Sequence, residues 1–194
     1  MLRAEAVQEV GLYPLSAVIS PNWFLQMHAL AFRTELLRQH NVTILEHCFY
    51  TDQEYVIYPL LHVKSVFMWD KHIYCYRIGR EGQSVSLDGW KKHCTDHDRV
   101  VRQILSHYNQ IQQCHNGVKT LIMARVMGLL RRQYNLYMVL GDKQKELKEF
   151  DAYIRKNHPE VFAARQAVEG KRLKMMRLTG FLLYPTLRKK ELED

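Results

Sequence analysis

A helical periodicity of apolar residues in the second half of the chain constrains the fold more than any other sequence feature. From about residue 87 onward, apolar residues recur about every 3.6 positions, which is the period of an amphipathic α-helix. Glycines at 117 and 141 are expected to separate successive helices, and Asp142 is expected to cap the helix that follows Gly141. Pro159 should open a last helix running to about Leu178, and Gly180 and Pro185 should end it. The predicted inward positions are Val100, Val101, Ile104, Leu105, Tyr108, Ile111, Val118, Leu121, Ile122, Val126, Leu129, Leu130, Leu147, Phe150 and Ile154.

The first 86 residues differ, because short helical, extended and turn signals alternate there. We expect a helix over residues 29–39, an extended piece over 42–45, and β-structure over 63–69 and 72–78 with a turn between them. Thr51 and Glu54 have the spacing of a capping box, which predicts a helix from Asp52 to about Leu61. Ser86 is expected to cap the next helix, with Asp88 in its first turn. The predicted fold class is therefore α+β and mostly helical, with a first part over 1–86 and a helical extension over 87–194.

The charge of the chain is strongly positive and unevenly distributed. The formal net charge is +8 and the pI about 9.3. The excess is concentrated after residue 118, above all over 171–190, where cations mix with Leu, Met, Phe and Tyr. Such a segment suits contact with an anionic membrane surface, and a helix packed on its neighbour with a solvated charged face is the plainer interpretation. A basic balance also admits nucleic acid as a partner.

The four cysteines and the lengths of the apolar runs indicate the cellular compartment of the protein. No CxxC pair occurs, which favours reduced thiols over a disulfide framework. The first residues lack the apolar core of a signal peptide, and no apolar run approaches the roughly 20 residues that cross a bilayer. We therefore expect a cytoplasmic location, at or near the inner face of the membrane.

Three ordered segments of the first part resemble the second half of a known catalytic domain. They are HALAFRTELL (28–37), YTDQEY (50–55) and YCYRIGREGQSVS (74–86). In order and spacing they resemble family 2 glycosyltransferases of the GT-A fold, which build bacterial surface polysaccharides, over about residues 15–90. The resemblance implies the acceptor-side half of that domain, an inverting transfer of sugar from a nucleotide-sugar to a saccharide or lipid-linked acceptor, and no nucleic-acid partner.

Two features of that family do not occur in the sequence. The opening strand of the nucleotide-binding unit is absent, and no Asp-x-Asp motif precedes residue 50. That motif holds the divalent metal, Mg or Mn, that the full-length family requires. Asp96 and Asp98 have the spacing but follow the other segments, so the metal role is not carried over to them. We expect a truncated or split enzyme with little activity alone, because positioning and charge stabilisation supply most of such a reaction.

The resemblance also implies the roles of individual residues. Asp52 aligns with the aspartate of the family's Glu-Asp pair, with Thr51 in place of the glutamate, and becomes the candidate base for the acceptor hydroxyl. Its alternative role is a carboxylate that favours the first turn of a helix. His28 is a candidate substrate contact, and a structural histidine is the alternative. A glycine-containing loop spans residues 79–86, and the resemblance implies that it covers the diphosphate or the acceptor; an ordinary solvated loop is the alternative. The candidate substrate-binding residues on or beside this loop are Arg77, Arg80, Gln83 and Ser84.

Two further interpretations remain open on the residues alone. His93 and His97 have a spacing that suits zinc, but no third ligand follows, so no metal site is predicted. The alternative function for the whole chain is a non-enzymatic basic helical adaptor that binds an anionic membrane or nucleic acid. Salt-dependent binding to nucleic acid would favour it.

Overall fold

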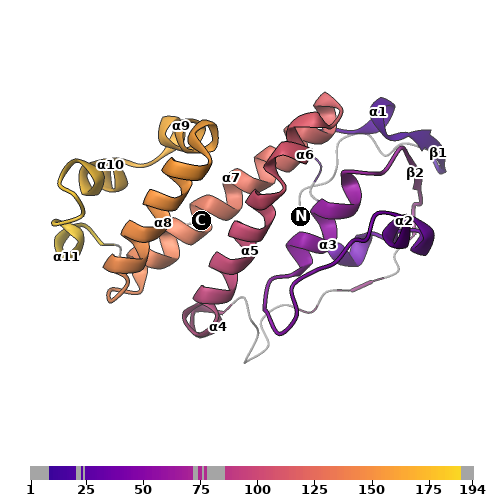
Figure 1. The fold of residues 1–194 in the computed structure, drawn as a ribbon. Helices are drawn as coiled ribbons and strands as arrows, with labels where there is room; N and C mark the ends of the chain where they lie inside the picture. The colour runs from indigo at the N-terminus through magenta and orange to yellow at the C-terminus, as the bar shows by residue number, and fades with distance from the viewer. Residues whose placement is uncertain are drawn as a thin grey trace. The chain divides into compact units, whose positions relative to one another are not determined.

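A computed structural model describes residues 9–20, 23, 25–71, 74–75, 77 and 86–188. The chain forms two compact units, one of residues 1–80 with 102–126 and the other of 81–101 with 127–194. Eleven α-helices, one 3-10 turn and a two-stranded sheet occur among the described residues (Figure 1), which confirms the mostly helical α+β class. Within the same residues, no helix is both long enough and apolar enough to cross a bilayer.

The first unit contains the sheet and the short helices. Strand β1 (Gly11–Pro14) pairs antiparallel with β2 (Ser65–Met68), with Gly11 opposite Met68. The prediction of β-structure over 63–69 is confirmed, but its observed partner is β1 and not the segment 72–78, most of which lies outside the described residues. Leu12 and Phe67 face each other across the pair and are largely exposed. The sheet therefore presents an open apolar face.

The helices of the first unit surround its small core. They are α1 (Leu15–Val18), η1 (Met27–Ala29), α2 (Thr34–Gln39) and α3 (Asp52–Leu60), together with α6 (Tyr108–Gln113). The helix predicted over 29–39 is wrong in its first turn, because residues 30–33 are not helical, with Leu30 and Arg33 extended, and only Thr34–Gln39 forms the α-helix. The piece over 42–45 joins no strand. Helix α3 begins at the predicted residue and buries Val56, Ile57 and Leu60.

The long helices α5 (Cys94–Ser106) and α7 (Asn116–Val139) supply residues to both units. Their predicted apolar positions are mostly buried, with Val100, Ile104 and Leu130 at most 1% exposed. Leu129 on α7 is only partly buried, as is Tyr108, which begins the neighbouring α6. The 3.6-residue stripe thus identified the core-facing side of both helices correctly.

The second unit is formed entirely of helices among its described residues. They are α4 (Leu87–Lys92), α8 (Gln144–Asn157), α9 (Pro159–Val168), α10 (Lys171–Leu178) and α11 (Tyr184–Leu187), with parts of α5 and α7. Ser86 caps α4 as predicted, since its hydroxyl accepts a hydrogen bond from the Gly89 N–H at 3.0 Å. The cap expected from Asp142 is wrong, because Lys143 holds the N-cap position of α8 without a side-chain bond.

The helix predicted from Pro159 to about Leu178 is two helices, α9 and α10, and a buried ionic network links them. The chain leaves α9 at Glu169, and the Glu169 carboxylate turns inward to bind the guanidinium of Arg177 on α10. Arg177 also donates to Asp151 at 2.7 Å, and the Tyr134 hydroxyl donates to the same carboxylate at 2.9 Å. The break at Glu169 therefore brings a second acid to Arg177, and α8, α9 and α10 are joined by one arginine.

Candidate functional site

Asp52 lies at the first position of α3, a helix of the first unit with a largely buried second half. The five residues from Val56 to Leu60 are buried, so the start of the helix has a fixed position. The Asp52 carboxylate is half-buried and accepts a hydrogen bond from Gln53 Nε2 at 2.6 Å. Burial raises the pKa of this carboxyl above its ordinary value, against the opposing effects of the Gln53 bond and the charge of Arg125.

Arg125, on α7, is the residue of this site that sequence reasoning missed. Its Nε donates to Gln53 Oε1 at 2.9 Å and one terminal nitrogen donates to the Leu25 carbonyl at 2.6 Å. Burial lowers the pKa of Arg125, and the Asp52 charge acts in the opposite direction. The signal was present, because Arg125 follows Leu121 by four positions on the apolar side of the helix, where a cation is unusual.

The amide of Gln53 links the two charged groups. Arginine has only donors, so the Gln53 oxygen must face Arg125 and the Gln53 NH2 group must face Asp52. The amide is therefore fixed in one orientation and holds the carboxylate from one side. A desolvated carboxylate that is held in place and has a nearby cation is a suitable acceptor for a hydroxyl proton.

The other predicted site residues have different outcomes. His28 lies in η1, which packs against α3, and its ring stacks on Tyr74 with centroids 4.7 Å apart. The structure thus brings the element of His28 next to the helix of Asp52. Arg77 is exposed, and Arg80, Gln83 and Ser84 lie outside the described residues. The roles of these loop residues stay predictions.

Glu54 does not have the capping role that its spacing predicted. Thr51 holds the N-cap position but makes no side-chain cap bond, and its backbone is already helical. Glu54 is fully buried and accepts from the Leu45 N–H at 3.0 Å and from the Tyr58 hydroxyl at 2.8 Å. The Glu54 carboxylate therefore provides the acceptor for the backbone N–H of Leu45. The two groups meet because the segment before α3 folds back over the helix.

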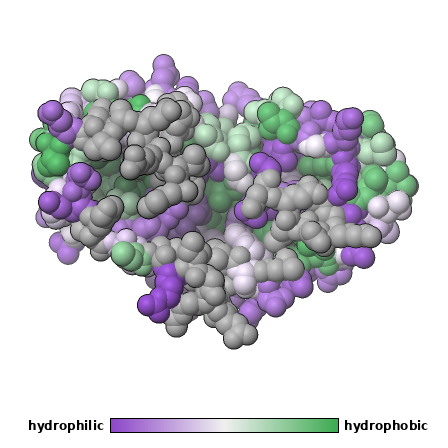
Figure 2. Space-filling model, turned by 180° about the vertical axis from the view of Figure 1, so that it is seen from behind, coloured by the Kyte–Doolittle hydropathy of each residue, from purple (hydrophilic) through white to green (hydrophobic). Residues whose placement is uncertain are grey.

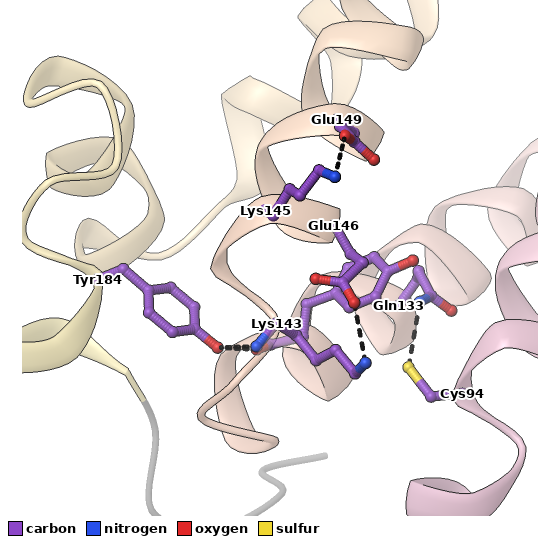
Figure 3. A network of polar contacts seen from close by, with 8 residues as sticks. Cys94, Gln133, Lys143, Lys145, Glu146, Glu149 and Tyr184 are labelled. Atoms are coloured by element: carbon purple, nitrogen blue, oxygen red, sulfur yellow. Dashed lines mark hydrogen bonds and ion pairs between the residues drawn. The ribbon is translucent and has the colours of Figure 1, made fainter.

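The histidine pair at 93 and 97 has structural partners. His97 is 1% exposed, and its Nδ1 lies 2.6 Å from Gln133 Oε1. The Gln133 amide then donates to Cys94 Sγ at 3.5 Å (Figure 3). His93 instead faces Asp96 at 3.2 Å. No group of three metal-binding side chains occurs in the part of the chain that the structure describes. Burial lowers the pKa of His97 to about 4, which keeps the ring neutral at physiological pH.

Comparison with known proteins identifies no relative: no protein family, no curated protein and no solved structure matches the chain.

Proposed function

We propose that this chain is the acceptor-side part of an inverting family 2 glycosyltransferase, with Asp52 as the general base. In the reaction, the Asp52 carboxylate takes the proton of an acceptor hydroxyl while the oxygen of that hydroxyl attacks the anomeric carbon of the donor. The bond from that carbon to the nucleotide diphosphate breaks, and the diphosphate leaves with the electron pair. In this proposal the nucleotide-sugar and its divalent metal are bound by a part of the enzyme that this sequence does not contain.

The observation that carries the proposal is the environment of Asp52. A carboxylate at the start of a helix is normally stabilised in its charged form, which lowers its pKa. Asp52 shows the opposite direction, because the loss of solvent outweighs the cation and the hydrogen bond beside it. A fold gains nothing in stability from such a group, and a raised pKa makes a carboxylate a stronger base.

Saccharide binding to the chain tests the proposal. We would measure binding of a panel of mono- and oligosaccharides by saturation-transfer NMR, with Asp52→Asn and Asp88→Asn as matched variants. Both aspartates lie in the first turn of a short helix, but Asp88 is on the exposed α4. The neutral amide at 52 should weaken binding about fivefold, since a hydrogen bond to a charged group is worth about 1 kcal/mol more than a neutral one. Asp88→Asn should have no effect.

Stability provides a second measurement that separates the two roles of Asp52. The folded-state pKa is raised, so the ionised group disfavours the fold above that pKa, and this cost disappears as the pH falls through it. Asp52→Asn should therefore stabilise the protein at neutral pH, with a difference that shrinks on acidification. A loss of stability, of the roughly 0.3–1 kcal/mol typical of a first-turn carboxylate, would favour the plain helix role.

The results also distinguish the enzyme from the adaptor. If no saccharide binds, or if both variants lose binding equally, the transferase proposal fails. Binding of vesicles or nucleic acid by a chain that binds no saccharide would then favour a basic adaptor.

A further inference from the structure

Helix α10 and the turn after it expose apolar side chains beside cations. Leu178 is 86% exposed and Leu182 78% exposed, and Met175 and Leu183 are also solvent-accessible. Lys171 and Lys174 on the same helix are exposed. We call these six residues the C-terminal cationic face. Figure 2 shows hydrophobic atoms next to hydrophilic ones at the right-hand edge of the view, where α10 and α11 lie.

The spacing of these residues places the helical ones on one side of α10. Positions 171, 174, 175 and 178 follow the i, i+3, i+4, i+7 pattern of a single helical face. Leu173 and Met176 lie on the opposite side and are at most 2% exposed. The helix is therefore amphipathic in an unusual sense, because its outward side combines lysines with large apolar groups.

The exposed leucines belong to a firmly anchored segment. Gly180 has φ +58°, its N–H donates to the Arg177 carbonyl, and the Phe181 N–H donates to the Met176 carbonyl, which together form a Schellman helix end. Phe181 and Tyr184 are buried, and the Tyr184 hydroxyl donates to the Tyr137 carbonyl at 2.5 Å. The turn thus fixes Leu182 outward while Phe181 and Tyr184 pack inward.

The charge of the segment indicates what covers this face. No aspartate or glutamate occurs from Lys171 to Arg188, whereas five lysines or arginines do, Arg188 included. Of these, Arg177 is committed to the buried acids of the unit. Lysines that flank exposed leucines match a partner with a negatively charged layer above an apolar one, and a bilayer with anionic lipids has that structure.

We propose that the C-terminal cationic face binds the surface of a membrane that contains anionic lipids. Leu178 and Leu182 enter the boundary between headgroups and acyl chains, and Lys171 and Lys174 contact lipid phosphates. The chain lies on the membrane through this face. This inference does not depend on the role of Asp52.

Vesicle sedimentation tests the proposal. The full chain is mixed with phosphatidylcholine vesicles, with or without phosphatidylglycerol, at low and high salt. It should bind only the anionic vesicles and be released by salt. Removing both charges in Lys171→Gln/Lys174→Gln should weaken binding about 25-fold, at about fivefold per cation. Leu178→Ser/Leu182→Ser should weaken it by at least about tenfold.

The open sheet face supplies the matched control. Leu12 and Phe67 are also exposed apolar residues, but the strands that carry them are flanked by both Glu9 and Lys64. Leu12→Ser/Phe67→Ser should leave vesicle binding unchanged, and circular dichroism should show that each variant is folded. The proposal is overturned if the chain ignores anionic vesicles, binds neutral ones equally, keeps its affinity in the C-terminal variants, or loses it equally in the sheet variant. Binding of nucleic acid or self-association through the C-terminal face, without vesicle binding, also overturns it.

Discussion

Acidification should destabilise this protein through one buried imidazole. His97 is packed edge-on against Trp90 and bonded to Gln133, and burial is the main reason that its pKa falls from 6.5 to about 4. The charge of Arg132 lowers it further, while the Gln133 bond acts in the opposite direction. Between pH 6.5 and about pH 4, the unfolded chain binds a proton at His97 and the folded chain does not. Acidification over this range therefore favours the unfolded state.

The magnitude follows from that interval. The native fold keeps its full stability with respect to His97 above pH 6.5 and loses it as the pH falls toward about 4. At about 1.4 kcal/mol per pKa unit, the loss amounts to about 3 kcal/mol. For a domain with 5–15 kcal/mol of total stability, roughly the usual range, this is a large fraction.

Urea unfolding followed by circular dichroism, repeated from about pH 7 to about pH 4, measures this loss. His97→Asn retains an amide donor near the Nδ1 position but does not titrate, so its stability should fall less with pH by about 3 kcal/mol. An exposed histidine provides the control, and His47→Asn should keep the full wild-type dependence. Parallel pH profiles for wild type and His97→Asn would show that His97 does not cause the loss of stability in acid.

Two pairs of substitutions test individual contacts within the units by the same unfolding assay. Arg177→Met should cost about 3–5 kcal/mol, because it leaves two buried carboxylates without their cation. Lys145→Met, which removes only the exposed ion pair with a neighbouring glutamate (Figure 3), should cost less than about 1 kcal/mol. Equal costs for the two variants would show that burial of the Arg177 ion pairs does not affect stability. Ser86→Ala should cost about 1 kcal/mol. Thr51→Ala, at a cap position without a side-chain bond, should change stability by less than about 0.5 kcal/mol. A larger cost for Thr51→Ala than for Ser86→Ala would indicate that Thr51 caps α3 after all.

The sequence predicted best those features that depend on local spacing. Leu147, Phe150 and Ile154 have helical spacing and are fully buried, and Ser86 caps its helix through a bond three residues away. Gly180 ends α10 because its backbone enters the left-handed region that glycine tolerates. Each of these outcomes is decided within one or two turns of chain.

Features that depend on distant partners were not predictable in the same way. The pairing of β1 with β2 joins segments about fifty residues apart, and a four-residue strand with a terminal proline carries little signal. Glu54 has the spacing of a cap residue, but a folded-back segment and Tyr58 compete for its oxygens. Arg125 reaches Gln53 across 72 positions of sequence, so no local pattern indicates that the two meet.

The passage of α5 and α7 through both units has a consequence for dissecting the protein. A cut after residue 86 would remove from the first unit the residues 102–126, including the buried Ile111 and Val118. It would also detach Arg125 from Gln53. Neither piece would then contain a complete hydrophobic core, so each half expressed alone should be insoluble. Limited proteolysis should likewise release no independently stable half.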